Sequence, residues 1–186
     1  MKRSILKYIP VVIMGLSLAS CLKNNNLYES YDSLQPVADL PKAKANALTS
    51  TTPTNSYVVL DTTAGGVDYP TAVHISSNDH VGDVVVRMRI DKAAAQTWVT
   101  ANAGGYQVLP DSLYTIASMD VTVPNAGVFS TGDFIIRIKS NAKNAGGVNV
   151  FKANKFILPV SIDKVVSASY GVAENFRTIL WYIRVK

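Results

Sequence analysis

The chain has 186 residues, with enough apolar side chains (48%) for a packed core, 18 basic and 13 acidic residues, and a formal net charge of +5. Three of the basic residues and none of the acidic ones lie in the first 20 positions, so the remainder has a net charge of only +2. This near balance, without a basic run interleaved with aromatic residues, argues against nucleic-acid binding. The single cysteine excludes an intramolecular disulfide, so apolar burial must hold the fold together.

Residues 1–20 have the layout of a cleavable secretory signal. Three basic residues open the segment, and the apolar run 9–18 that follows is short for a helix that spans a bilayer. Leu18-Ala19-Ser20 then leads directly to Cys21, an order that resembles a bacterial lipobox, in which the cysteine is lipidated and the chain is cut just before it. We therefore predict a lipid on Cys21 that tethers the protein to a membrane. The alternative is an ordinary signal peptide followed by a stray cysteine.

The segment 21–55 is predicted to be a flexible tether. It is rich in Ser, Thr, Asn, Ala and Pro, and it shows no sustained apolar period. Such a composition suits a linker that lifts a domain off a lipid surface. The alternative is that the part from Tyr28 to Leu40, which contains tyrosines and leucines, packs against the domain.

From Tyr57 onward, short β-rich runs alternate with turns, and we assign 56–186 to one β-domain. The predicted strands lie at 57–60, 71–75, 83–91, 121–123, 134–138, 156–162 and 178–185. Strand 83–91 places Val84, Val86 and Met88 on one face. In the last run every second residue from Ile179 onward is apolar, which is typical of a half-buried strand.

Residues 91–103 break the β pattern and predict a short helix. The stretch is rich in alanine, Asp91 stands at the N-cap position, and Gly104-Gly105 follows its end. Trp98 and Val99 are expected to dock this helix on the edge of the sheet. About seven short strands with one helical crossover predict an all-β fold, an immunoglobulin-like antiparallel β-sandwich with one short helix, preceded by the flexible tether.

Four segments of the β-domain are distinctive in their order along the chain. They are Tyr-Gln-Val-Leu-Pro-Asp-Ser-Leu-Tyr-Thr-Ile (106–116), Val-Thr-Val-Pro-Asn-Ala-Gly (121–127), Phe-Ile-Leu-Pro-Val-Ser-Ile (156–162) and the terminal run 178–186. Together they resemble the DUF1735 family, an N-terminal domain type of Bacteroidetes surface lipoproteins. The resemblance implies an immunoglobulin-like fold and a role near polysaccharide-utilisation systems, where family members are sometimes fused to glycoside hydrolases or carbohydrate-binding modules. Because this chain stops after the domain, we expect no fused catalytic unit.

The residues give little support for catalysis, and we predict neither an enzyme nor a cofactor. A glycosidase needs two carboxylates about 5–10 Å apart across a cleft. Glu29 and Glu174 are the only glutamates, and most of the aspartates stand at turn positions, where Asp caps backbone amides. The only histidines are His74 and His80.

A metal site is considered at Asn78-Asp79-His80 and Asp83, where oxygen and nitrogen ligands lie close together in the sequence. The cluster lacks the regular spacing of a calcium loop. A polar turn capped by Asp79 explains the residues better, and we predict no metal site.

Aromatic residues are the usual platform for sugars, because the C–H faces of a pyranose ring stack on flat π surfaces. Trp98 and Trp181 are expected to serve as packing residues. Tyr69, Tyr106 and Tyr170 each stand next to Pro or Gly in expected loops, where an exposed ring could bind a ligand. These three are the candidate ligand-binding residues, and packing within the loops is the alternative.

A modification is also considered. Asp32-Ser33-Leu34, Asp61-Thr62-Thr63 and Asp111-Ser112-Leu113 match an Asp-Ser/Thr-apolar pattern that resembles the O-glycosylation acceptor of exported Bacteroidetes proteins. Ser33 and Thr62 are the candidate acceptors, because both are expected in the tether or in a turn.

The sequence therefore predicts a non-enzymatic, lipid-anchored protein of the outer membrane, either surface-exposed or periplasmic. Its expected partners are the membrane, through the lipid, and either polysaccharide or proteins of an outer-membrane uptake system. The alternative is a structural spacer or protein–protein interaction module without a glycan ligand. Loop aromatics on one face would favour glycan binding, and an edge strand suited to β-augmentation would favour a protein partner.

Overall fold

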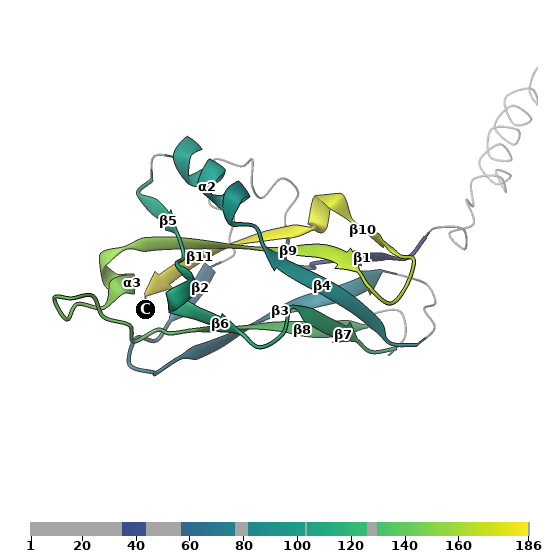
Figure 1. The fold of residues 1–186 in the computed structure, drawn as a ribbon, viewed down its shortest axis with the longest axis horizontal. Coiled ribbons are helices and arrows are strands. Elements are labelled where there is room, and N and C mark those ends of the chain that lie inside the picture. The colour runs from purple at the N-terminus through teal and green to yellow at the C-terminus, as the bar shows by residue number, and fades with distance from the viewer. Residues whose placement is uncertain (1–34, 44–56, 77–81, 103, 126–129, 186) are drawn as a thin grey trace, which may run out of the picture. The chain divides into compact units, whose positions relative to one another are not determined.

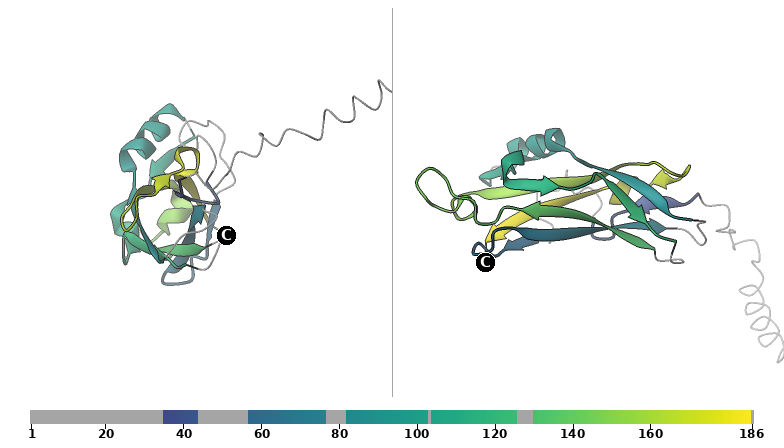
Figure 2. Two further views of the ribbon diagram at one scale, coloured as in Figure 1. Left: turned by 90° about the vertical axis from the view of Figure 1, so that its right-hand side faces the viewer. Right: turned by 60° about the horizontal axis from the view of Figure 1, so that its bottom comes forward.

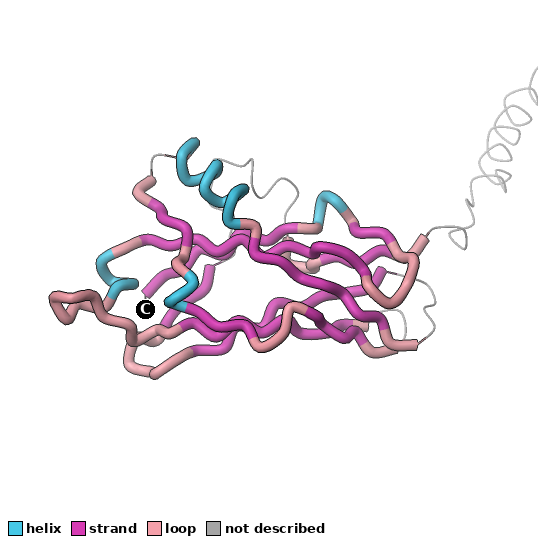
Figure 3. Tube along the Cα trace, viewed as in Figure 1, coloured by secondary structure: helices cyan, strands magenta, loops and turns pink. Residues whose placement is uncertain are grey.

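Two β-sheets pack face to face across an apolar core in the computed structural model of the protein (Figure 1 and Figure 2). The structure describes residues 35–43, 57–76, 82–102, 104–125 and 130–185. The strands are β1 (Val37–Asp39), β2 (Tyr57–Leu60), β3 (Val67–Ser76), β4 (Val84–Ile90), β5 (Tyr106–Val108), β6 (Tyr114–Ile116), β7 (Asp120–Val123), β8 (Thr131–Ile138), β9 (Lys155–Val165), β10 (Gly171–Val172) and β11 (Thr178–Val185). The helices are α2 (Lys92–Ala101) and α3 (Val150–Ala153), with the 3-10 turns η3 (Asp111–Leu113) and η4 (Glu174–Phe176) (Figure 3).

The first sheet has the strand order β10-β1-β3-β8-β6. The second sheet has the order β2-β11-β9-β4-β7, and β5 pairs with the beginning of β9. Most neighbouring strands are antiparallel, but β1 with β10, β2 with β11 and β5 with β9 are parallel. The predicted all-β sandwich is confirmed. The sequence pattern predicted antiparallel strands and did not reveal these three parallel pairs. Among the described residues, no helix has the length and apolar character that crossing a membrane requires.

Alternating side chains from both sheets fill the core between them. In β8 every second residue is buried, and in β4 the inward set is Val84, Val86 and Met88, as the alternation predicted. Gly132 of β8 lies so close to β7 that a Cβ there would stand 2.4 Å from the Thr122 carbonyl oxygen. This contact leaves room for glycine only.

The N-terminal boundary of the domain requires a correction. The predicted tether 21–55 includes β1, which pairs with β3 and β10 as an inner strand of the first sheet. Ala38 and Leu40 are fully buried, and the Leu40 amide donates to the Phe176 carbonyl oxygen at 3.0 Å. Residues 35–43 therefore belong to the domain, in keeping with the alternative that this stretch packs against it. Three residues of strand are too short for a period to show in the sequence.

The last strand also differs from its prediction. Instead of being half-buried, β11 is buried on both faces from Ile179 to Ile183. The reason is α2, which packs with Trp98 on the outer face of the second sheet, against Ile157, Leu180 and Tyr182. Figure 1 shows α2 on the side of β9 and β11 that faces away from β3 and β8. The helix thus docks on the face of the sheet and not, as predicted, on its edge.

Candidate functional site

Helix α2 arises where the chain leaves the second sheet at the end of β4. The Asp91 carboxylate caps it by accepting the Ala94 amide at 3.0 Å, as the sequence predicted. Asn102 closes the other end, since its backbone amide and its side-chain amide both donate to the Trp98 carbonyl oxygen. The chain then returns to the sheet as β5, beside the first residues of β9. This excursion creates a second, smaller apolar cluster outside the main core.

Three aromatic rings form the centre of that outer cluster. Trp98 of α2, Tyr106 of β5 and Tyr182 of β11 contact one another edge to face, with ring centroids 5.6 Å (Trp98–Tyr106), 5.8 Å (Trp98–Tyr182) and 5.6 Å (Tyr106–Tyr182) apart. Each such contact contributes about 0.5–1.5 kcal/mol beyond the burial of its area. Tyr106 is the least buried of the three: it is half-buried, whereas Trp98 and Tyr182 are buried.

A pocket of about 470 Å³ opens beside Tyr106 and Tyr182. Its other described lining residues come from α3 and its C-cap residue, from the first residue of β9 and from the end of β11: Phe151, Lys152, Ala153, Asn154, Lys155, Ile183, Arg184 and Val185. Helix α3 is held in place by Phe151, whose ring packs edge-on against Phe156 at 5.5 Å. Asn149 caps this helix by accepting the Phe151 amide at 2.9 Å. Three aromatic rings (Tyr106, Phe151 and Tyr182) and several polar groups therefore meet in one concavity.

The charged residues of the pocket are all basic. Lys152, Lys155 and Arg184 line it, and there is no carboxylate among its described lining residues. The Lys155 ammonium lies 5.7 Å from the centroid of the Tyr106 ring, within the range of a cation–π contact. The sequence analysis identified Tyr106 but not these cations. The sequence carries no signal for them, because a lysine at the start of a strand looks the same whether it lines a pocket or faces solvent.

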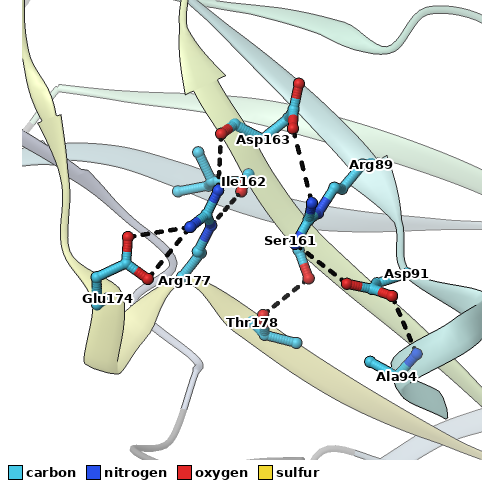
Figure 4. A network of polar contacts seen from close by, with 9 residues as sticks. All are labelled: Arg89, Asp91, Ala94, Ser161, Ile162, Asp163, Glu174, Arg177 and Thr178. Atoms are coloured by element: carbon cyan, nitrogen blue, oxygen red, sulfur yellow. Dashed lines mark hydrogen bonds and ion pairs between the residues drawn. The ribbon is translucent and has the colours of Figure 1, made fainter.

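The other half of the same outer face is a network of ion pairs and hydrogen bonds (Figure 4). Arg89 lies 3.1 Å from Asp91 and 3.9 Å from Asp163. Arg177 binds Glu174 at 3.0 Å and donates to the carbonyl oxygens of Ile162 and Asp163 at 2.8 and 2.9 Å. The guanidinium groups here are satisfied by the protein itself.

A more open concavity of about 590 Å³ lies around Arg87, Arg89 and Lys92. Here too the charges are paired within the protein. Arg87 forms a bidentate pair with Asp120, at 2.7 and 2.8 Å, and Lys92 pairs with Asp111.

Asp111 is the centre of a small hydrogen-bonded group in that concavity, because it also accepts the Tyr114 hydroxyl at 2.5 Å. Hydrogen bonds from Lys92 and Tyr114 hold the pKa of Asp111 below its usual value. Burial and the bond to Asp111 raise the pKa of Tyr114. Self-neutralised charges make this concavity a weaker candidate for a ligand than the Tyr106 pocket.

A His–Asp–Ser group lies on the outer face of the first sheet, and the sequence analysis did not anticipate it. The Asp39 carboxylate lies 3.2 Å from His74 Nδ1 and accepts the Ser76 hydroxyl, which is itself 3.3 Å from the same ring nitrogen. In a nucleophilic triad the hydroxyl and the carboxylate address opposite nitrogens of the imidazole. The group therefore matches a clasp between β1 and β3 and not that arrangement.

The three candidate tyrosines do not share a surface. Tyr69 lies in β3 and not in a loop; its ring packs against the inter-sheet core, and its hydroxyl donates to the Val59 carbonyl oxygen of β2. Burial raises the pKa of Tyr69. Tyr170 packs against the same core beside β10. Tyr106 lines the pocket described above, and it lies in strand β5 instead of the expected loop. Trp181 is a core residue, as predicted.

Several predicted sites lie outside the described residues, among them Cys21, Ser33 and Asn78-Asp79-His80. Thr62 is half-buried in a turn in which the Asp61 carboxylate accepts the amide and hydroxyl of Thr63. Asp83, the remaining member of the considered metal cluster, accepts the Asn125 amide at 3.2 Å. Within the part of the chain that the structure describes, no three His, Cys, Asp or Glu side chains gather as metal ligands would.

Comparison with known proteins places this fold in a family. The model of a family described as "-like, N-terminal domain" matches residues 41–169, more than half of the chain. The chain belongs to this N-terminal domain family. A sequence comparison finds no match among curated proteins.

Two solved structures resemble the domain in fold. One is a candidate carbohydrate-binding protein from Bacteroides ovatus, with a TM-score of 0.54, 11% identity, and coverage of 80% of this chain and 36% of that one. The other is a two-domain protein of unknown function from Bacteroides fragilis, with a TM-score of 0.56, 12% identity, and coverage of 83% and 47%. The chain thus spans less than half the length of either protein, and the likeness concerns the fold.

Proposed function

We propose that the protein is a non-enzymatic glycan-binding component of a polysaccharide-utilisation system, held at the outer membrane by a lipid on Cys21. We also infer that its N-terminal domain family is DUF1735, on the ordered segments from 106–116 to 178–186. The observation that carries the function is the pocket at Tyr106. The fold's likeness to a candidate carbohydrate-binding protein supports the same direction.

The pocket has the features that a sugar site needs. Its volume of about 470 Å³ lies in the range of small-molecule sites, roughly 300–1,000 Å³. The partly exposed Tyr106 ring offers a π surface for a pyranose face, and it is held rigidly by Trp98 and Tyr182. Asn154 and the two lysines supply hydrogen-bonding groups for sugar hydroxyls. A pre-formed ring costs little conformational entropy on binding.

The rival function, a protein-interaction module, finds less support at the sheet edges. The edge strands β2, β7, β6, β10 and β5 have 4, 4, 3, 2 and 3 residues, which is short for the addition of a partner strand. One of them, β2, is also bound by the Tyr69 hydroxyl at its Val59 carbonyl. The pocket is therefore the better-founded ligand site.

Affinity gel electrophoresis of the purified full chain against plant, mucin and microbial polysaccharides tests the proposal. We expect retardation by at least one glycan, and we expect Tyr106→Leu to weaken it about tenfold, the equivalent of ~1.4 kcal/mol. Leucine keeps an apolar side chain against Trp98 but removes the aromatic face. Tyr170→Leu is the matched control and should leave retardation unchanged. An absence of retardation across a broad panel would favour the protein-interaction alternative.

The lipid anchor has a separate test. Intact mass of the mature protein from its native host should show an acylated chain that begins at Cys21, and Cys21→Ser should abolish both acylation and membrane association. An unmodified Cys21 would reject the anchor.

The same mass spectrum tests glycosylation. Added hexose mass that Ser33→Ala or Thr62→Ala removes would support these two acceptors, and the absence of added hexose mass would reject them.

A further inference from the structure

The lysines of the Tyr106 pocket differ from the arginines near β4 and η4 on the same face of the sheet. Among the described residues, neither Lys152 nor Lys155 has a carboxylate within ion-pair distance, and the pocket lining contains none. By contrast Arg87, Arg89 and Arg177 all have carboxylate partners. Two lysine ammonium groups thus line one concavity with no carboxylate partner among the described residues.

Three separate elements bring these charges together. Lys152 comes from α3, whereas Lys155 and Arg184 stand next to the last registered pair of β9 and β11, Phe156 with Ile183. Like charges that line one pocket repel one another, and an anion bound between Lys152 and Lys155 would relieve that repulsion. The Lys155 ammonium lies 5.7 Å from the centroid of the Tyr106 ring, so a positive charge stands beside the ring that would carry a sugar.

We propose that the pocket selects acidic sugars, residues that carry a carboxylate or a sulfate ester. This inference rests on the proposed glycan-binding function and specifies its substrate class. The Tyr106 ring stacks on the pyranose, while Lys152 and Lys155 pair with the anionic substituent. Ammonium groups accept either anion as point charges, so the chemistry is shared by uronic acids and sulfated sugars.

The experiment compares each acidic glycan with its neutral counterpart on the full chain. Polygalacturonate is paired with its carboxyl-reduced form, and a sulfated galactan with its desulfated form, with affinities measured by isothermal titration calorimetry. We expect at least one acidic glycan to bind about tenfold or more tightly than its partner, with a preference that weakens as ionic strength rises. The glycan pair that shows this preference, carboxylated or sulfated, identifies the anionic group that the pocket binds.

Two double variants separate the pocket from general attraction of polyanions. The variant Lys152→Gln with Lys155→Gln should reduce acidic binding to the neutral level. The control, Lys42→Gln with Lys164→Gln, removes the same charge from exposed positions outside the pocket and should retain the preference. Thermal unfolding verifies that both variants are folded.

The outcomes distinguish the two proposals. Equal affinity for acidic and neutral glycans, or an acidic preference that survives the loss of Lys152 and Lys155, overturns this inference and leaves glycan binding intact. Equal weakening by both double variants overturns it as well, since it would indicate attraction by net charge. No binding of any glycan, acidic or neutral, overturns the proposed function itself.

Discussion

Both halves of the outer face of the second sheet carry basic side chains, but these side chains are paired within the protein in only one half. Near β4 and η4, Arg89 and Arg177 are tied to Asp163, Glu174 and backbone carbonyl groups (Figure 4). Near α3, Lys152 and Lys155 line a pocket that has no described carboxylate. A guanidinium that already binds several protein atoms stabilises the fold, whereas an ammonium without a protein anion remains free to bind an external one.

Helix α2 separates these halves, and its anchor offers the largest test. Trp98→Ala should lower the free energy of unfolding by about 3–5 kcal/mol, because the 3%-exposed ring fills the cluster above Leu180 and Tyr182. Chemical denaturation measures the loss. Glycan affinity should fall too, since Tyr106 loses its supporting ring. Thr97→Ala, on the exposed side of the helix, should change stability by less than about 0.5 kcal/mol. A small loss for Trp98→Ala would show that α2 contributes little to this face.

Arg177 tests whether the ion-paired half is structural. Arg177→Gln should cost about 1–3 kcal/mol, because the carbonyl oxygens of Ile162 and Asp163 lose their donor. Glu174→Gln removes only the carboxylate, which is 72% exposed, and should cost less than about 1 kcal/mol. Urea denaturation compares the two variants, and glycan binding should be unaffected in both. Equal losses would mean that the ion pair, and not the carbonyl bonds, provides the stabilisation.

Lys155 provides the complementary test in the pocket. Lys155→Gln should change stability by no more than about 1 kcal/mol, since only a cation–π contact with Tyr106 is lost. The same denaturation experiment, with Lys164→Gln as the control, measures this. A loss above about 2 kcal/mol would assign Lys155 to the structural half of the comparison and remove the contrast.

The smallest expected effect is the loss, at acid pH, of the stabilisation by the Arg87–Asp120 pair. The hydrogen bond and charge of Arg87 hold the pKa of Asp120 below its usual value. Because the folded pKa is the lower one, this stabilisation is present above the unfolded value of about 3.9 and is lost as pH falls through the folded pKa. The stability difference between wild type and Asp120→Asn should therefore be constant at neutral pH and shrink below about pH 4. A difference that persists undiminished to about pH 2 would point to hydrogen-bond geometry instead of charge.

Much of the fold follows from local patterns. The alternation in 83–91 fixes which side of β4 faces the core, and Asp91 followed by an alanine-rich stretch starts α2 at the expected residue. These predictions succeed because strand period and helix capping depend on neighbours within a few residues. Gly105 beside Tyr106 likewise led to the prediction of Tyr106 as a candidate ligand-binding residue. The prediction placed Tyr106 in a loop, whereas it lies in strand β5.

Other properties depended on contacts between distant residues. The sequence itself determined the β-sandwich class, the short helix and one residue of the pocket. Only the tertiary structure decided that α2 covers β11, that Tyr69 binds Val59, and that β1 belongs to the domain. It also decided that Tyr106 meets Lys152, Lys155 and Arg184, because sheet register and helix docking, which no local period encodes, bring these side chains into one pocket.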